Sequence, residues 1–268
     1  MTSHPRILNL LISLIVLSLA PALHAATKSD QDKEKRWREQ IEPSLMVGDA
    51  VSLKAAGAEF LALFTESSEK QTFGGVILVH GIGVHPAWPE VIEPLRSELP
   101  EHGWHTLSLQ MPILANGAAT KDYAPLFDEV PARIQAGVDF LKSKGVNNIA
   151  LVSHSLGTTM SSYYLANQND RSVRAFVAIS FGPGLAKQAK MDSFENFAKV
   201  TIPTLDIYGS DDFQTNVNSA NTRKLIAKKA GNKKYTQVKI EGANHFFAGM
   251  EDLLIKRIRG WLTRNTAN

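Results

Sequence analysis

Residues 149–157 read IALVSHSLG and are followed by the helix-forming stretch TTMSSYYLA at residues 158–166. The four apolar residues predict a buried strand, and Ser155 then stands on the turn between that strand and a helix. A strand–turn–helix with a serine at its apex is the context required of a nucleophile elbow. The turn strains the backbone at the serine and brings the residues two positions before and after it close to neighbouring elements. Gly157 keeps the usual glycine, whereas Ser153 replaces the other with a small residue; the alternative is a chance S-x-S-x-G in an ordinary loop.

Similar apolar runs recur along the chain at intervals that leave room for helices. They predict further strands at residues 59–64, 76–79, 105–110, 173–180, 204–208 and 235–240. Several runs are continuous rather than alternating, as expected for strands covered on both faces. Between the runs, residues 127–141 and 250–261 carry apolar side chains three or four positions apart, which predicts helices. The sequence therefore predicts an α/β fold with a mostly parallel sheet and helices on both faces.

The composition is that of a globular protein with a substantial core. The chain has 268 residues, of which 44% are hydrophobic and 21% charged, and this length allows one large or two small domains. Cysteine is absent, which excludes disulfides, thiolate metal ligands and cysteine nucleophiles. The formal net charge of +3 is too small and too scattered to indicate nucleic-acid binding.

The N-terminal residues predict an export signal. Arg6 precedes an apolar stretch at residues 7–20, and small residues follow at 22–26. This is the layout of a secretory signal peptide at residues 1–25, cleaved after Ala25. The alternative is an uncleaved membrane anchor. We expect export across the inner membrane into a bacterial periplasm, with no stable membrane insertion once the signal is removed.

The rest of the chain divides into two regions. Residues 27–42 are dense in charge, so residues 26–57 are predicted to form a charged N-terminal arm or helix. Residues 58–268 show neither an internal repeat nor a low-complexity linker, and we expect them to form a single α/β domain.

Acidic residues and a histidine follow the later predicted strands. Asp211 and Asp212 come shortly after one strand, and His245 follows the next. A carboxylate at the end of a strand can orient a histidine, which can then take a proton from a serine. Together with Ser155 these residues give the chain order serine, aspartate, histidine, and either aspartate is chemically able to fill the role.

From about Glu59 to the C-terminus, the sequence resembles the α/β-hydrolase superfamily, because these residues occur in that family's order and at strand ends. It is also similar to a small group of exported bacterial α/β-hydrolase-like proteins of unassigned function. The shared stretches are VILVHGIG, GWHTLSLQMP, ALVSHSLG and IPTLDIYGSDD. This nearer resemblance implies no particular substrate.

The resemblance to α/β-hydrolases implies a role for each residue of the serine–aspartate–histidine set. Ser155 would be the nucleophile, and His245 would act first as general base and then as general acid. Asp212 stands three residues after Gly209, where the family's orienting acid commonly lies. Asp211 is the alternative acid.

A glycine-containing loop, His80-Gly81-Ile82-Gly83, follows the predicted strand VILV. It resembles the His-Gly loop after the third strand of the same fold. The resemblance implies that the backbone amides of Ile82 and Leu156 form an oxyanion hole, which His80, Gly81 and Gly83 support. The alternative is a plain glycine-rich strand exit.

Other polar residues are interpreted as structural. His154 is expected to pack beside the oxyanion loop, and Asp206 to be a hydrogen-bonded acid inside its strand. His102 and His105 have a spacing that could serve a metal but lack further ligands, so we expect surface histidines. A cluster of basic residues is interpreted as the solvated face of a helix. Binding to anionic surfaces of the cell envelope is the weaker alternative. The members of the cluster are Arg223, Lys224, Lys228, Lys229, Lys233 and Lys234. We expect neither a metal nor another cofactor.

The segment at residues 181–202, where this fold commonly carries a lid, is too short to form a cap domain with its own core. We expect a short helix at residues 192–199 and a shallow, open cleft. Phe194 and Phe197 either line one edge of the cleft or pack onto the sheet.

Taken together, these features predict an exported serine hydrolase that cleaves carboxylic esters, small or lipid-like, through an acyl-enzyme. The alternative is a catalytically inactive scaffold of the same fold that acts as an envelope binding protein, since fold does not fix function.

Overall fold

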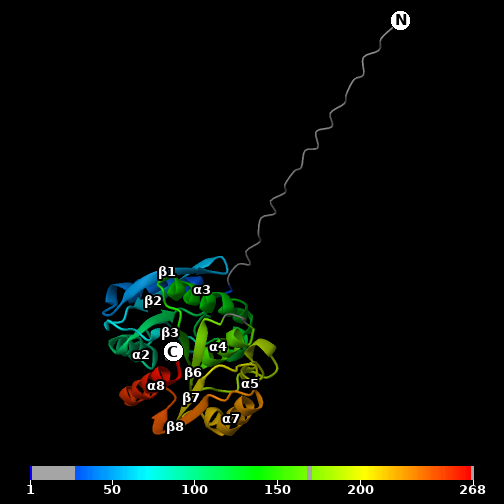
Figure 1. The fold of residues 1–268 in the computed structure, drawn as a ribbon. Helices are drawn as coiled ribbons and strands as arrows, with labels where there is room; N and C mark the ends of the chain where they lie inside the picture. Colours follow the sequence, from blue (N-terminus) through cyan, green and yellow to red (C-terminus); the bar gives the residue numbers. More distant parts are fainter. Residues whose placement is uncertain (2–27, 168–170, 267–268) are drawn as a thin grey trace.

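The computed structural model describes Met1 and residues 28–167 and 171–266. Apart from Met1, the expected signal peptide lies outside the described residues. Eight strands form one sheet in the order β1-β2-β4-β3-β5-β6-β7-β8. The β1–β2 and β2–β4 pairs are antiparallel, and all other neighbours are parallel. The mostly parallel sheet predicted from the sequence is therefore confirmed (Figure 1).

All the strands predicted from apolar runs are present, and one further strand precedes them. The strands are β1 Asp49–Ala55, β2 Ala58–Thr65, β3 Gly74–Val79, β4 Trp104–Leu109, β5 Ile149–His154, β6 Val173–Ile179, β7 Thr204–Asp211 and β8 Tyr235–Asn244. Every residue of β3 and β5 is buried, because helices cover both faces of the sheet at its centre. This burial explains why these two strands lack a polar face.

Helices cover the two faces of the sheet. The α-helices are α1 Gln31–Ile41, α2 Ile92–Glu98, α3 Val130–Ser143, α4 Leu156–Asn167, α5 Ser193–Phe197, α6 Gln214–Asn218, α7 Ala220–Lys229 and α8 Glu251–Thr266. The 3₁₀ helices are η1 Glu42–Ser44, η2 Leu99–His102, η3 Thr120–Asp128 and η4 Ala189–Met191. Helices α3, α4, α5 and α7 pack on one face, and α2 and α8 on the other (Figure 1).

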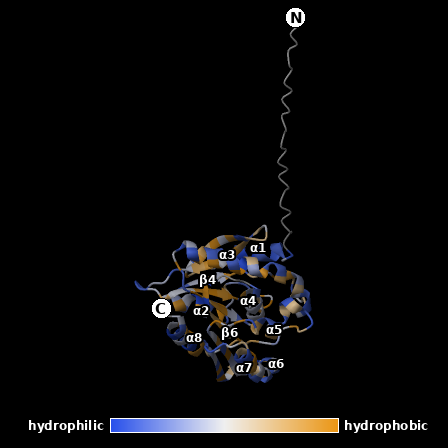
Figure 2. Cartoon of the chain, turned by 45° about the vertical axis from the view of Figure 1, so that its right-hand side comes forward, coloured by the Kyte–Doolittle hydropathy of each residue, from blue (hydrophilic) through white to orange (hydrophobic). Residues whose placement is uncertain are grey.

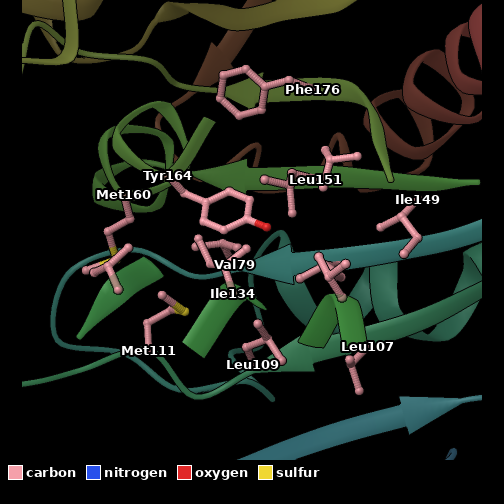
Figure 3. Packing of buried hydrophobic residues seen from close by; sticks show 14 of the residues in the cluster. Val79, Leu107, Leu109, Met111, Ile134, Ile149, Leu151, Met160, Tyr164 and Phe176 are labelled. Carbon is pink, nitrogen blue, oxygen red and sulfur yellow. The ribbon is translucent and has the colours of Figure 1, made fainter. Parts of the chain in front are cut away.

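The core consists of two large apolar clusters, one on each face of the sheet. In the first, Ile134 of α3 and Met160 and Tyr164 of α4 lie against Val79 and Leu151 of the central strands (Figure 3). The second contains buried residues of α2 and α8. Figure 2 shows hydrophobic strands in the interior, surrounded by helices whose outer sides are hydrophilic. This packing fixes the strand ends on which the candidate site is built.

Within residues 28–57, the expected charged helix is present as α1, and a strand that was not expected there, β1, follows it. Strand β1 pairs with β2 along its whole length. Helix α1 packs through Ile41 against Leu61 and Leu63 of β2, whose other side chains face the main core. The sheet therefore begins before residue 58, at β1. Strand β2 has two apolar sides, and α1 covers one of them.

The segment at residues 181–202 forms a short helix but does not line the cleft with its phenylalanines. Phe197 is fully buried, with its ring 5.3 Å from that of Phe181 and 6.0 Å from that of Tyr235. Phe194 also lies edge-on to Phe181. Of the two expectations for these rings, packing onto the sheet is correct for Phe197, whereas Phe194 packs against Phe181; neither ring lines the cleft.

No helix within the described residues combines the length and apolar character needed to cross a membrane.

Candidate active site

Ser155 lies on a tight turn between β5 and α4. Its φ angle is +54°, in the left-handed region that a non-glycine residue rarely adopts. The turn is held by a hydrogen bond from the Ser155 amide to the carbonyl of Ile179, 3.0 Å long. A Cβ atom on Gly157 would lie 2.3 Å from the carbonyl oxygen of Val79, so α4 can approach β3 only with glycine here. The predicted strand–turn–helix context of Ser155 is present.

Ser153 fits the position where glycine is usual because its hydroxyl has a partner. Its side chain is fully buried, and Ser153 Oγ lies 2.7 Å from Ser161 Oγ on α4. A buried hydroxyl without a hydrogen bond would be costly. The pair therefore satisfies the extra group and links β5 to α4.

The structure brings Ser155, His245 and Asp212 together. His245 Nδ1 lies 2.7 Å from Asp212 Oδ1, and His245 Nε2 lies 3.0 Å from Ser155 Oγ. A carboxylate only accepts hydrogen bonds, so Nδ1 carries the proton. His245 Nε2 is then free to accept the proton of the Ser155 hydroxyl. This is the geometry of a serine activated by an oriented base.

Asp212 is buried and well supplied with donors. Its Oδ1 atom accepts hydrogen bonds from His245, from the Phe213 amide at 2.6 Å and from Asn216 Nδ2 at 3.0 Å. Burial opposes ionisation, but the bond from His245 and the other donors outweigh it and hold the pKa of Asp212 below its usual value. Asp211 is instead exposed and accepts from Ser210 Oγ. Between the two candidate acids, the structure places Asp212 against His245.

The backbone carbonyl of His245 is fixed by two side chains. His154 Nε2 lies 2.9 Å from this oxygen, and Ser180 Oγ donates to it at 3.1 Å. Burial, aided by the charge of nearby His245, lowers the pKa of His154 to about 4. His154 is therefore neutral near pH 7 and donates through Nε2–H. Its place beside the site is that of a support for His245.

Asn216 links Ser180, which supports His245, to Asp212. Its Nδ2 atom donates to the Ser180 carbonyl at 3.1 Å and to Asp212 Oδ1 at 3.0 Å. Ser180 itself has a φ of +57°, so this strand end is also strained. Ser180 and Asn216 could not be predicted from the sequence, because no motif marks them and only the folding of the chain places them beside His245 and Asp212.

His80 fixes the expected oxyanion loop from within. Its Nδ1 donates to the Gly81 carbonyl at 2.8 Å, while Nε2 accepts from the Met111 amide at 2.9 Å. Complete burial lowers the pKa of His80 to about 3, so the ring stays neutral. A Cβ on Gly81 would lie 3.2 Å from Ser155 Cβ, which shows how closely the loop approaches the serine. Gly83 has a φ of +70° and turns the chain away.

A cleft of about 340 Å³ opens beside Ser155. Its lining includes Ile82, Leu156 and His245. Leu156 begins α4, and amides at a helix N-terminus have no intrahelical acceptor. Residues Thr120, Thr159, Ser180, Gly182, Pro183, Gly184, Leu185, Phe213, Thr215 and Asn216 complete the lining. Ile82 and Leu156, the residues expected to supply the oxyanion amides, thus line the same cleft as the serine.

Aromatic rings surround the imidazole of His245. The Phe213 ring stacks on it with centroids 4.0 Å apart, although 57% of Phe213 is exposed. Phe246 lies edge-on to the imidazole at 4.9 Å. Phe213 lines the cleft and was not predicted from the sequence; for Phe194 and Phe197 the sequence left open whether they line the cleft or pack onto the sheet.

The other residues singled out in the sequence lie away from the cleft. His102 Nε2 bonds Arg259, and His105 Nδ1 accepts from the Ser67 amide. Asp206 is fully buried and accepts from Arg223, Tyr235 and Gln237, which confirms the expected hydrogen-bonded acid. Arg223 is thereby removed from the predicted solvated basic face.

Among the described residues, no group of three or more histidine, aspartate and glutamate side chains is arranged to hold a metal ion.

Solved structures share this fold. The Pyrococcus furiosus esterase Pf2001 matches with a TM-score of 0.66 at 15% identity, over 82% of this chain and 93% of that one. Est1E from Butyrivibrio proteoclasticus matches with a TM-score of 0.63 at 16% identity, over 81% and 98%. The Pyrococcus horikoshii acylaminoacyl peptidase matches at 0.65 and 13% identity, over 87% of this chain and 44% of that one. At these identities the matches establish the α/β-hydrolase fold alone.

No curated protein matches the sequence significantly. A family model does: the model of DUF3530, described as a protein of unknown function, matches residues 8–126 and 118–264. These two segments span nearly the whole chain, which therefore belongs to the DUF3530 family and has the α/β-hydrolase fold.

Proposed function

We propose that this protein is a serine hydrolase that cleaves carboxylic esters through an acyl-enzyme intermediate. The observation that carries the proposal is the hydrogen-bonded chain Ser155–His245–Asp212, with Ser155 on a strained turn facing a cleft. The strained backbone at Ser155 costs stability, and such strain clusters at active sites. A serine hydroxyl that is hydrogen-bonded to a histidine base is the arrangement of an activated nucleophile.

The first half of the reaction acylates Ser155. His245 Nε2 takes the hydroxyl proton as Oγ bonds to the ester carbonyl carbon, and the carbonyl oxygen becomes an oxyanion. The amides of Ile82 and Leu156 donate to this oxygen. The intermediate then expels the alcohol, which receives the proton from His245.

The second half releases the acid. A water molecule gives a proton to His245 and attacks the acyl carbon, and Ser155 Oγ leaves with the proton that His245 returns. Asp212 holds the imidazole in the required tautomer and stabilises its charged form throughout.

Esters are the preferred substrate class because their alcohols leave more readily than amines. The cleft mixes threonine side chains with Ile82, Leu185 and Phe213, which suits small or lipid-like acyl groups. The structural matches include proteins named as an esterase and as a peptidase, which is consistent with acyl transfer in this fold. Neither metal nor cofactor is required by this chemistry.

A fluorophosphonate probe on the purified protein tests the proposal. We expect labelling of the wild type, loss of labelling in Ser155→Ala and normal labelling in Ser153→Ala, a matched change two residues away. Folded but unlabelled wild type would support the inactive binding scaffold instead. Hydrolysis of soluble esters but not of matched anilides would support the ester preference.

The proposed location is the periplasm, on the basis of the signal-like sequence at residues 1–25. Cell fractionation followed by N-terminal sequencing tests it. A mature chain that begins at Ala26 is expected, whereas a membrane-bound chain with an intact N-terminus would show that the segment is an anchor.

A further inference from the structure

A buried ion pair joins the N-terminal helix to the main domain. Both Glu34 oxygens on α1 accept from Arg133 on α3, with Nη1 and Nη2 at 3.0 and 2.9 Å. The two side chains are 7% and 2% exposed. Burying such a pair costs desolvation energy that only good geometry offsets, so its presence at this place needs a reason.

The ion pair leads directly to the segment after β4. Arg133 Nη1 also donates to the Gln110 carbonyl at 2.9 Å. Gln110 Nε2 in turn donates to the Met111 carbonyl at 2.8 Å and lies 3.2 Å from His80 Nε2. Residues 110–119 have no regular secondary structure, so side-chain contacts of this kind hold their backbone in place.

A second set of contacts joins the N-terminal segment directly to the segment after β4. The Asp30 amide donates to the Ile113 carbonyl at 2.9 Å, and the Ile113 amide donates to Ser29 Oγ at 2.8 Å. Lys33 Nζ donates to the Leu114 carbonyl at 2.9 Å. The N-terminal segment therefore holds residues 110–114 at several points.

The held segment positions the oxyanion loop. The Met111 amide donates to His80 Nε2, and His80 Nδ1 donates to the Gly81 carbonyl. Gly81 lies against Ser155, and the next residue carries the amide assigned to the oxyanion. The chain of contacts thus runs from Glu34 through Arg133 and residues 110–111 to the loop at 80–83.

We propose that the N-terminal segment at residues 28–41 is a positioning element for the oxyanion loop, with Glu34 and Arg133 as positioning residues. The inference rests on the proposed function, because it assigns Ile82 a place in the reaction. Oxyanion donors act most strongly in the transition state. Loosening the loop should therefore lower kcat and leave KM nearly unchanged.

Arg133→Lys tests this with Arg96→Lys as the matched control. Lysine keeps the charge but cannot donate to Glu34 and Gln110 in the same fork geometry. Arg96 is equally buried, at 1%, and bonds Glu93, the Val47 carbonyl and Thr65, away from the loop. We expect Arg133→Lys to lower kcat by at least about tenfold. The loss should stay below the ~10²–10³ that follows the removal of a whole oxyanion donor. Arg133→Lys should weaken binding of a boronic acid by a similar factor, because boronic acids form a tetrahedral serine adduct.

Hydrogen exchange, followed by mass spectrometry, gives a readout that does not depend on turnover. Arg133→Lys should speed amide exchange at residues 80–83 and 110–114, and Arg96→Lys should not. If the wild type is active but Arg133→Lys leaves kcat and exchange unchanged, the positioning role is wrong and the proposed function stands. If the wild type is inactive but exchange changes as expected, the coupling stands and the proposed function is wrong. Equal loss of kcat in both variants would also overturn the inference.

Discussion

Two parts of the cleft, the His245 side and the His80 side, are supported from different regions of the chain. On the His245 side, His154 ends β5, Ser180 follows β6 and Asn216 lies in α6. All three bond His245 or Asp212 directly. On the His80 side, the loop is held by the segment after β4. That segment is in turn held by a helix that precedes the whole sheet.

This difference separates two kinds of support. The His245 side is held by single hydrogen bonds to His245 and Asp212, so each loss should act on the proton transfer proposed for these residues. The His80 side is held by a relay of contacts that ends in a buried ion pair, so a loss should act on the oxyanion and on folding together. The comparison makes quantitative expectations possible.

The largest effect is expected from the acid on the His245 side. Asp212→Asn should lower kcat by about 10⁴, as for the equivalent change in a serine protease, because the imidazole would be held in the wrong tautomer. Asp211→Asn, its exposed neighbour, should change kcat by less than about tenfold, because only surface contacts are lost. Steady-state kinetics on folded variants checks this. The reverse ranking would transfer the orienting role to Asp211.

Both sides should make stability depend on pH, because each contains a buried neutral histidine. The pKa of His80 falls to about 3 and that of His154 to about 4, whereas unfolded histidine titrates near 6.5. At pH 5 the unfolded chain binds protons that the folded chain does not, so stability falls as the pH drops below about 6.5. The two groups together should cost about 4 kcal/mol between pH 7.5 and 5.

Urea unfolding at several pH values measures this cost. His154→Gln should remove about half of the loss that His80 and His154 cause together, about 2 kcal/mol, because glutamine does not titrate. An unfolding free energy that stays flat from pH 7.5 to 5 would contradict the neutral, buried state of both histidines.

A smaller effect should follow from removing one donor to the His245 carbonyl. His154→Phe keeps a ring of similar size but loses the Nε2–H donor, and we expect kcat to fall about tenfold as His245 shifts. His154→Gln retains a donor at similar reach and should recover most of the activity. Ser180→Ala combined with His154→Phe should cost more than the sum of the single changes in free energy, because the carbonyl then loses both donors. Strict additivity would indicate that the two donors act independently.

The smallest effect should come from the rim of the cleft. Phe213→Ala removes the ring stacked on His245 and should lower kcat/KM by about two- to tenfold, the range expected for one aromatic pair. Leu225→Ala on α7 is the matched control, because Leu225 is 58% exposed and Phe213 57%. Soluble esters should turn over without a lag, since the cleft is open. A sharp rise in rate only at micelle formation would instead indicate a mobile lid.

The His245 side could largely be predicted from the sequence, and the His80 side only in part. Ser155, Asp212 and His245 each follow a strand that could be recognised in the sequence, and parallel strands bring such ends to one edge of the sheet. The loop at residues 80–83, for which an oxyanion role is proposed, could be located for the same reason, because it follows the strand VILV. Its supports could not, because Glu34 and Arg133 lie 99 positions apart in regions without a motif.

Strand β1 shows why part of the fold was missed as well. Its sequence DAVSLKA buries only Leu53, so it has no apolar run of the kind that marks the other strands. As an edge strand it is defined by its pairing with β2 rather than by its own sequence. Asn216 also escaped prediction, because it lies in the five-residue helix α6, which no sequence pattern marked, and its role depends on partners that only the fold supplies.

The Ser153–Ser161 hydroxyl pair has a consequence for how related sites can be recognised in sequences. A pattern that demands glycine two positions before the nucleophile rejects this chain, although its turn is intact. The physical requirement is a small side chain at this position. If that side chain is polar, its polar atom must find a hydrogen-bond partner, as Ser153 does in Ser161 of α4. The spacing S-x-S-x-G-x-x-x-S states that requirement directly. Chains that carry the first serine without the second should have lost the turn, or should fill the gap with a different hydrogen-bonding side chain.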